Sequence, residues 1–270
     1  MRYVVKAMAL GEVLDQAVVL TKDHFKMLFG ISCFLLVPLN LAHQFSIYAI
    51  APGMLRGENP EQLANEGLGK LLLVLGINLV FVLLLVFVAM PLTNAALIRA
   101  VASEYLDRPT TAWRTFRETL GLLLPLIGTS LLAGLIVFAG SLACLIPGIY
   151  FALCYYLTTH TVVIEERAGW DALTRSHQLM KGNMVAAFVL GLLLGVIGVF
   201  AQLMGNMIPI IPIAIVVNSL VQGVLVALGA AAAVVFYFSC RCKHEDFDLT
   251  ILASAVAQEE TPGAQVPAAQ

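Results

Sequence analysis

The sequence predicts an all-α integral membrane protein: six transmembrane helices in three hairpins, each hairpin preceded by an amphipathic helix at the cytoplasmic interface. Three observations support this fold class. The 270 residues are 60% hydrophobic and only 12% charged, whereas about 25% of residues in soluble domains are charged. Six stretches approach or exceed the roughly 20 apolar residues needed to cross a bilayer. The basic residues gather in alternate connecting segments, as the positive-inside rule requires.

The six predicted spans contain no Asp, Glu, Lys or Arg in their interiors, which fits the high cost of a charge in mid-membrane. They are residues 27–50, 71–98, 120–145, 148–164, 184–207 and 213–240. With their connecting segments they form one membrane domain, residues 1–256. Residues 257–270 are polar and rich in Pro and Ala, a composition typical of a disordered tail.

The Pro147-Gly148 pair interrupts a long apolar run from Leu120 to Ile164. A single helix of that length would measure about 67 Å, roughly twice the thickness of the hydrocarbon core. Proline lacks a backbone donor, and glycine readily adopts the positive φ that ends a helix. We therefore expect Pro147 and Gly148 to form a tight turn between the third and fourth spans.

The charge distribution predicts the orientation. Thirteen of the 15 basic residues fall on one side of a six-span topology, and only Arg56 and Lys70 fall on the other. Both termini are therefore expected in the cytoplasm, and the protein in a bacterial inner membrane. The net charge of −2 gives no indication of a nucleic-acid partner.

The segments before the first, third and fifth spans have helical apolar spacing. Leu14–Lys22 resembles Leu173–Lys181, which indicates either three internal repeats or a chance similarity of two amphipathic helices. Trp113 and Trp170 are typical interfacial anchors. The basic side chains here either bind anionic lipids of the inner leaflet or only set the topology. The candidate lipid contacts are Arg114, Arg117, Arg175 and Lys181.

Neutral polar residues inside the spans are the candidates for an intramembrane polar cluster. Such side chains either pack helices together or line a hydrophilic pocket. The seven candidates are Asn40, His43, Asn78, His160, Gln202, Asn218 and Gln222.

The sequence contains no recognisable catalytic constellation or cofactor motif, so we expect neither enzymatic activity nor a cofactor. The stretch Cys240–His244, "CRCKH", offers two thiols and an imidazole but lacks the fourth ligand of a structural zinc site. A serine without a base partner, such as Ser130, is typical of helix packing.

Several short motifs in the second half of the chain resemble a widespread family of uncharacterised prokaryotic six-helix membrane proteins. That family is similar to the membrane domain of glycerophosphoryl diester phosphodiesterases. The motifs are Ile146–Tyr150, Val163–Glu165, Ala172-Leu173, Arg175-Ser176, Lys181-Gly182 and Phe247–Leu249. In those enzymes the chemistry belongs to a separate soluble domain that this sequence lacks, so the resemblance implies no phosphodiesterase activity.

Three functions remain open at this point. The leading hypothesis is a non-enzymatic scaffold that organises membrane lipids or a membrane-protein partner. The second is a transporter or channel for a small neutral or lipidic molecule. The third is a membrane-embedded lipid enzyme, which would need ionisable residues clustered at one depth.

Overall fold

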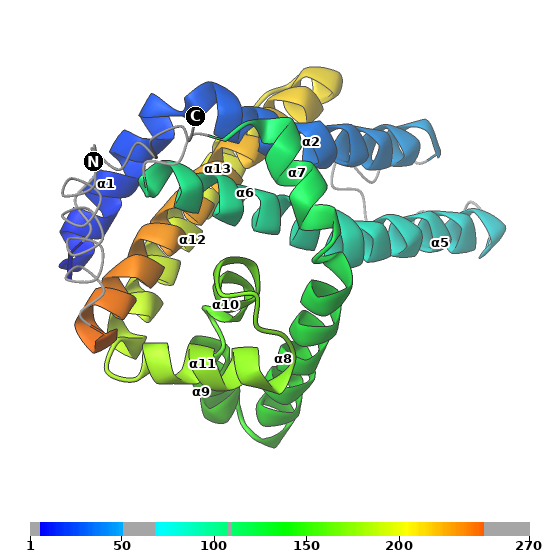
Figure 1. Ribbon diagram of the computed structural model, residues 1–270. Coiled ribbons are helices and arrows are strands. Elements are labelled where there is room, and N and C mark those ends of the chain that lie inside the picture. The colour runs from blue at the N-terminus through cyan, green and yellow to red at the C-terminus, as the bar shows by residue number, and fades with distance from the viewer. Residues whose placement is uncertain (1–5, 51–67, 107–109, 246–270) are drawn as a thin grey trace, which may run out of the picture.

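The computed structural model describes residues 6–50, 68–106 and 110–245, and within these ranges it contains helices and no β-strand (Figure 1). The predicted tail, residues 257–270, and the Phe247–Leu249 motif lie outside the described residues. The helices are α1 (Leu10–Asp23), α2 (Phe25–Ile50), α5 (Leu68–Leu84), α6 (Met90–Tyr105), α7 (Ala112–Leu120), α8 (Leu123–Ala143), α9 (Leu145–Cys154), α10 (Thr158–Ile164), α11 (Trp170–Met180), α12 (Met184–Asn206) and α13 (Ile211–Glu245). A π-helical segment, η1 (Leu85–Ala89), joins α5 to α6.

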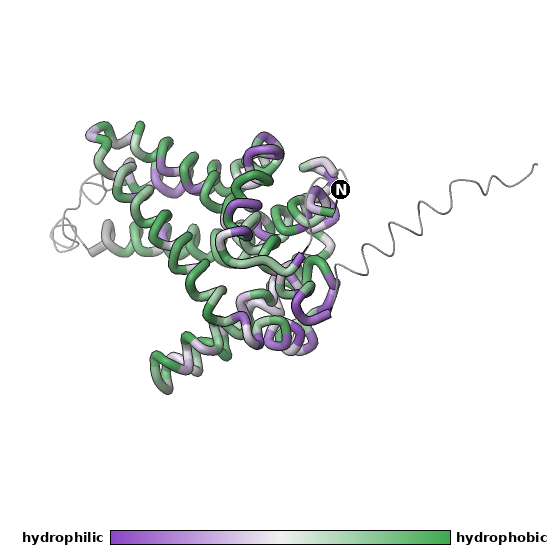
Figure 2. Tube along the Cα trace, turned by 90° about the vertical axis from the view of Figure 1, so that its left-hand side faces the viewer, coloured by the Kyte–Doolittle hydropathy of each residue, from purple (hydrophilic) through white to green (hydrophobic). Residues whose placement is uncertain are grey.

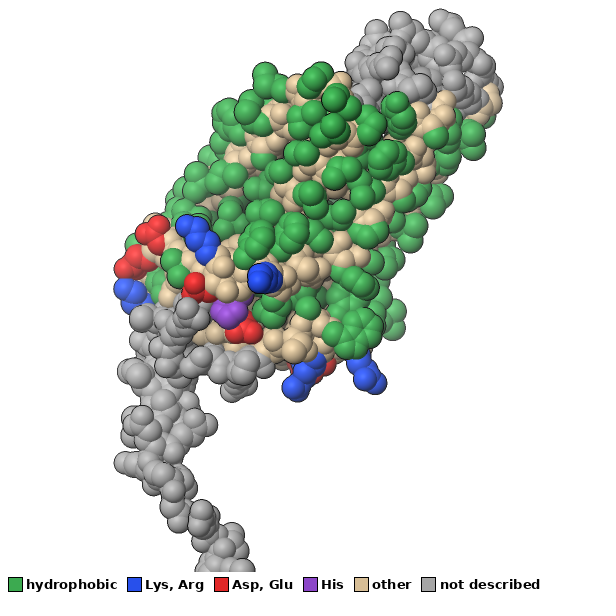
Figure 3. Space-filling view, turned by 90° about the horizontal axis from the view of Figure 1, so that it is seen from above, with side chains coloured by type: hydrophobic (Ala, Val, Ile, Leu, Met, Phe, Trp, Pro, Cys, Tyr) green, Lys and Arg blue, Asp and Glu red, His purple; other side chains and the backbone are tan. Residues whose placement is uncertain are grey.

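Five of these helical runs are long and apolar enough to cross a membrane, as expected of a membrane-embedded protein. They are α2, the continuous α5–η1–α6 run, α8, α12 and α13. The long helices are hydrophobic along most of their length (Figure 2). The space-filling view shows a broad apolar surface with Lys, Arg, Asp and Glu gathered at one end, which we call the charged end (Figure 3).

The protein core surrounds the C-terminal half of α13. Every residue from Ala230 to Cys240 is buried, because α1, α2, α6 and α12 all pack against this helix. The apolar face of α1, with Val13, Ala17 and Leu20, is buried, and the Met8 amide donates to Ser239 Oγ at 2.9 Å. The first predicted amphipathic segment is therefore docked onto the bundle by its apolar face.

The structure differs from the prediction at the fourth span. Residues 148–164 do not form one helix; they are divided between α9 and α10, with three residues in turns between them. Neither piece is long enough to cross the hydrocarbon core alone. The apolar composition that predicted a span is present, but the continuous helix is not.

The turn before α9 also lies earlier than predicted. The backbone leaves helical geometry at Cys144, with φ −170° and ψ 154°, and Pro147 and Gly148 belong to the first turn of α9. Proline is tolerated there because the first amides of a helix have no intrahelical acceptor. Gly148 has a different role: a Cβ at this position would lie 2.9 Å from Ser141 Cα. Its missing side chain lets α9 pack closely against α8.

The π-helical segment has a local cause in the sequence. Pro91 is the second residue after this segment and has no amide to donate, and its ring would clash with the carbonyl of residue 87 in a regular α-helix. Widening the preceding turn to π geometry removes that clash and keeps the apolar run continuous.

Candidate functional site

At the break between α9 and α10 the Thr158 amide donates to the Tyr155 carbonyl, so a side-chain hydroxyl takes the place of the helical donor to the Cys154 carbonyl. Ser176 Oγ on α11 donates to the Cys154 carbonyl at 2.9 Å. Thr161 Oγ1 lies 2.8 Å from the Thr158 carbonyl and 3.2 Å from the Ala172 carbonyl. Buried backbone carbonyls need such partners. The break places the short helix α10 among α6, α8 and α11 (Figure 1).

His160 is the third residue of α10. It is 5% exposed, and neither Nδ1 nor Nε2 has a hydrogen-bond partner among the described residues. Its ring stacks on Tyr237 of α13, with 5.9 Å between centroids and 18° between planes. An unpaired buried polar group costs free energy, and native proteins contain few of them. The imidazole is therefore the most unusual buried group on this helix.

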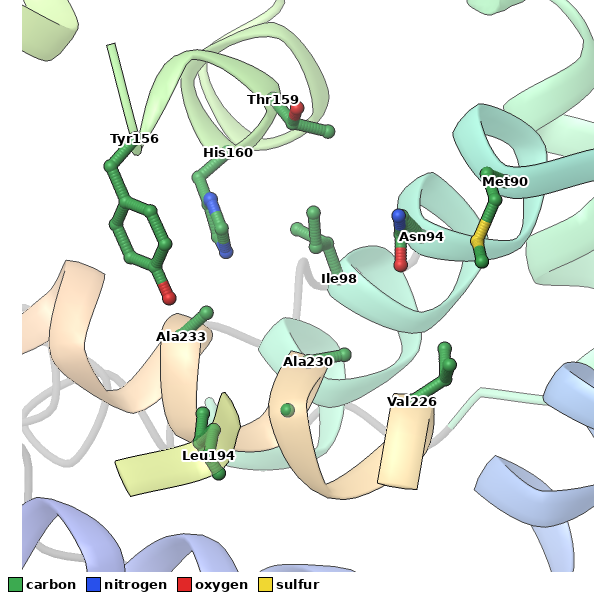
Figure 4. A pocket seen from close by; sticks show the side chains of 11 residues that line it. Met90, Asn94, Ile98, Tyr156, Thr159, His160, Leu194, Val226, Ala230 and Ala233 are labelled. Carbon is green, nitrogen blue, oxygen red and sulfur yellow. The ribbon is translucent and has the colours of Figure 1, made fainter. Parts of the chain in front are cut away.

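His160 faces a cavity of about 400 Å³ that is open on one side and lined by residues of α6, α10, α12 and α13 and of the turn before α10 (Figure 4). Three further polar side chains line it, Asn94, Tyr156 and Thr159. The remaining lining residues are apolar or glycine: Met90, Ile98, Leu194, Val226, Gly229, Ala230 and Ala233. The small residues of α13 create the space, because a Cβ at Gly229 would have no atom within 4 Å.

A cluster of charged residues lies behind the Tyr237 ring. The Tyr237 hydroxyl donates to Glu165 Oε1 at 2.6 Å. Arg175 Nε lies 3.0 and 2.9 Å from the two oxygens of the same carboxylate, and Arg175 Nη2 pairs with Glu245. Arg241 Nε pairs with Glu245 at 3.1 Å, and its guanidinium carbon lies 5.9 Å from the Tyr237 ring centroid. This cluster joins α11 to the end of α13 and to the residue that follows α10.

The four candidate lipid contacts have different environments. Arg175 is only 14% exposed in its side chain and is held by two carboxylates, so it does not face a lipid surface. Arg114 is exposed but pairs with Glu118 at 2.8 Å; the hydrogen bond from Arg114 lowers the pKa of the Glu118 carboxyl. Arg117 and Lys181 are exposed, and neither has an ion pair with another described residue.

The two tryptophans are exposed on the short helices α7 and α11. Trp113 on α7 is 71% exposed and Trp170 on α11 is 64% exposed. Large apolar side chains in such positions are typical of the membrane–water interface.

The predicted intramembrane polar residues do not gather around one site. Of the seven, only His160 lines the cavity. Asn40 and His43 lie on α2 and Asn78 on α5, where the His43 ring lies 5.2 Å from the Phe81 ring. The remaining three are Gln202 on α12, which is exposed, and Asn218 and Gln222 on α13, which are half-buried.

Sequence reasoning missed several residues of the site. Tyr237 stands four residues before Arg241 in an otherwise apolar run, a spacing that places both on one helix face and could have drawn attention to it. Glu165 was noticed only as part of a family motif. Nothing in the local sequence distinguishes Asn94 or Tyr156 from ordinary packing residues.

The described residues contain no group of three or more His, Cys, Asp or Glu side chains that could hold a metal ion. Within "CRCKH", Cys240 and Cys242 are buried, and His244 Nε2 lies 3.0 Å from the Lys181 carbonyl oxygen. The two thiols and the imidazole are thus not brought together as a ligand set in the described part of the chain.

Comparison with known proteins gives one match. No curated protein and no solved structure matches the chain significantly. Residues 116–261 match the profile of a domain of unknown function, DUF8558, and this match includes α8 to α13 and the residues around His160. Because the match covers more than half of the sequence, the chain belongs to the DUF8558 family.

Proposed function

We propose that this protein binds a lipidic molecule inside its helix bundle and holds it in the bilayer without converting it chemically. The observation that carries the proposal is His160, a buried imidazole that faces a cavity of about 400 Å³ and whose two nitrogens have no partner in the described part of the chain. Ligand sites have volumes of about 300–1,000 Å³, mostly apolar walls and a few polar groups that fix orientation. A bound head group would supply the hydrogen bonds that the imidazole otherwise lacks.

The side chains around the cavity support binding rather than catalysis. His160 is the only ionisable residue other than a tyrosine among those that line it. The nearby carboxylates of Glu165 and Glu245 are engaged by guanidinium groups of the charged cluster. A lipid enzyme would need an acid, a base or a nucleophile beside the bound molecule, and this arrangement favours the non-enzymatic hypothesis.

The finer membrane arrangement belongs to the same proposal. The charged end would face the cytoplasm of a bacterial inner membrane, with both termini on that side. Segment α9–α10 would enter the bilayer as a broken helix, which is tolerated when protein or a cavity surrounds the irregular backbone. Interfacial helices α7 and α11 would then lie at the level of the head groups. The similarity to the membrane domain of glycerophosphoryl diester phosphodiesterases stays a prediction.

Transport is the alternative, and two features near the cavity favour it. The π-helical segment η1 ends next to Met90, which lines the cavity, and α9–α10 is interrupted within its apolar run. π-Bulges and broken helices recur at the binding sites of transporters. Movement of a lipid probe across the membrane of liposomes that contain the protein would support transport. Binding of the probe without such movement would support the proposed lipid-binding function.

The deciding experiment is mass spectrometry of lipids that co-purify with the protein from native membranes. We expect a defined lipid enriched over the bulk in the wild-type protein and lost in His160→Phe, which keeps an aromatic ring but removes both nitrogens. His43→Phe is the matched control, since His43 is also on an apolar helix but does not line the cavity. Identical lipid profiles in all three samples would contradict the proposal.

A further inference from the structure

The polar and apolar side chains that line the cavity lie toward opposite ends of it. His160 and Tyr156 lie at the end near Ala233, whereas Met90 and Val226 lie at the opposite end, with Asn94 between them (Figure 4). Val226 and Ala233 are separated by two helical turns of α13, or about 10 Å. The cavity is therefore elongated, with one polar end and one apolar end.

The polar end points toward the charged end of the molecule. His160 stacks on Tyr237, one helical turn beyond Ala233, and Tyr237 in turn contacts Glu165. The apolar end lies farther from the charged cluster, because Val226 stands eleven residues before Tyr237 on α13. A molecule with a polar head and an apolar chain would fit this site in one orientation, with its head beside His160.

The cavity has no charge with which to neutralise an ionised head group. None of its lining residues is Asp, Glu, Lys or Arg. The charged groups behind Tyr237 are already paired with one another: Glu165 with Arg175 and Arg167, and Glu245 with Arg175 and Arg241. An unpaired charge in a low-dielectric site is costly, so the site disfavours phosphate, carboxylate and ammonium heads.

The hydrogen-bonding groups at the polar end suit hydroxyl and carbonyl groups. A neutral imidazole provides one donor and one acceptor, and the hydroxyls of Tyr156 and Thr159 provide both. Neither nitrogen of the His160 imidazole has a partner among the described residues, so its donor and its acceptor are both available to a bound molecule.

We infer that the ligand is an uncharged amphiphile whose head carries hydroxyl or carbonyl groups, bound with the head at His160 and the chain toward Met90 and Val226. This inference rests on the proposed function and adds the charge class and the orientation of the bound molecule. Ordered water in place of a ligand is the competing occupant, because water also satisfies buried polar groups.

The test compares three probes that share one chain and differ in head-group charge: 1-monooleoylglycerol, oleate and oleylamine. Each is added to the delipidated full-length protein in a zwitterionic detergent, and the unfolding temperature is measured. We expect monooleoylglycerol to raise it by about 5 °C at a hundredfold excess over Kd, and the two charged probes to raise it by less than half of that. The response should disappear in His160→Phe.

A second variant keeps the test independent of His160. Gly229→Leu should fill the cavity, because a Cβ at Gly229 meets open space, and leucine is a better helix former than glycine. The variant should fold and lose the response to monooleoylglycerol. Gly195→Leu on α12 is the control; its Cβ also meets open space, but Gly195 does not line the cavity, so its response should match the wild type.

The outcomes separate this inference from the proposed function. If a lipid co-purifies in a His160-dependent manner but oleate or oleylamine stabilises the protein as strongly as monooleoylglycerol, the inferred charge class is wrong and the binding function stands. An unchanged response in Gly229→Leu overturns the placement of the ligand. If no lipid depends on His160 and no probe stabilises the protein, both proposals fail and water fills the cavity.

Discussion

Helices α12 and α13 follow each other in the chain and look alike in sequence, yet they occupy opposite environments. In α12 only Ala187, Leu190 and Gly205 are buried among the residues whose side chains are described, whereas all residues of α13 from Ala230 to Cys240 are buried. Both are apolar enough to cross a membrane. In a bilayer, both the protein core and the lipid-facing surface are free of water. Apolar composition therefore does not distinguish one from the other.

The residue types that do distinguish them are small and polar ones. Helix α13 brings Gly229 and the four alanines Ala230–Ala233 to the centre of the bundle, followed by Tyr237 and Ser239, which have hydrogen-bond partners. The G-x-x-x-G of α12, Gly191 and Gly195, is different: an added Cβ at either position would have no atom within 4 Å. That motif therefore packs against no helix of this chain in the described structure.

Truncating one phenylalanine in each helix tests this contrast with the largest expected effect. Phe238 is 1% exposed and stacks on Tyr105 at 5.3 Å, whereas Phe200 on α12 is 63% exposed. Phe238→Ala should lower the free energy of unfolding by about 3–5 kcal/mol, and Phe200→Ala should change it little. Thermal unfolding in detergent, followed by circular dichroism, measures both. Equal losses would mean that α12 is buried in a larger assembly.

A smaller effect is expected from the same substitution in two ion pairs, one in the core and one at the surface. The Glu165 side chain is 9% exposed and that of Glu118 is 37% exposed. Glu165→Gln removes one of the two carboxylates that neutralise Arg175 and should lower the free energy of unfolding by about 3 kcal/mol. Glu118→Gln should lower it by less than about 1 kcal/mol. Stability measured at low and high salt would separate them, because salt screens the exposed pair more. A salt-sensitive loss in Glu165→Gln would contradict a buried cluster.

The smallest effect concerns lipid binding at the charged end. Arg117→Gln and Lys181→Gln remove exposed charges that have no ion pair among the described residues. Each should lower the association of anionic lipid by about 1 kcal/mol, which is roughly a fivefold change. Arg114→Gln is the control, because Arg114 is already paired with Glu118. Quantifying the anionic lipid retained after purification gives the answer; an equal loss in all three variants would show that pairing is irrelevant.

The helical fold class was predictable from the sequence, and the interruption of the fourth span was not. Composition and the spacing of charges are local properties, and they locate five of the six predicted spans. The break before α10 depends on Ser176, whose hydroxyl reaches Cys154 across 22 residues of sequence. Residues 148–164 alone contain no charge or proline after Pro147 that would reveal it.

The candidate site was predictable to the same limited degree. His160 was one of seven neutral polar residues singled out within the predicted spans, and the structure places it at the wall of the cavity. Arg175 was expected to meet lipid because its own helix is amphipathic. Its partners Glu165 and Glu245 lie in other segments of the chain, and only tertiary packing brings them to it.

The π-helical segment Leu85–Ala89 determines which side chains of α6 face the bundle interior. A π turn holds about one residue more than an α turn, and each residue of a helix advances the side-chain direction by about 100°. Asn94 and Ile98 therefore face the cavity only because the extra residue is present. A relative that lacked one residue in this segment would keep the same hydropathy profile and the same span. It would nevertheless turn a different face of α6 toward His160, so ligand preference could diverge within the family through a single-residue deletion that leaves the membrane topology unchanged.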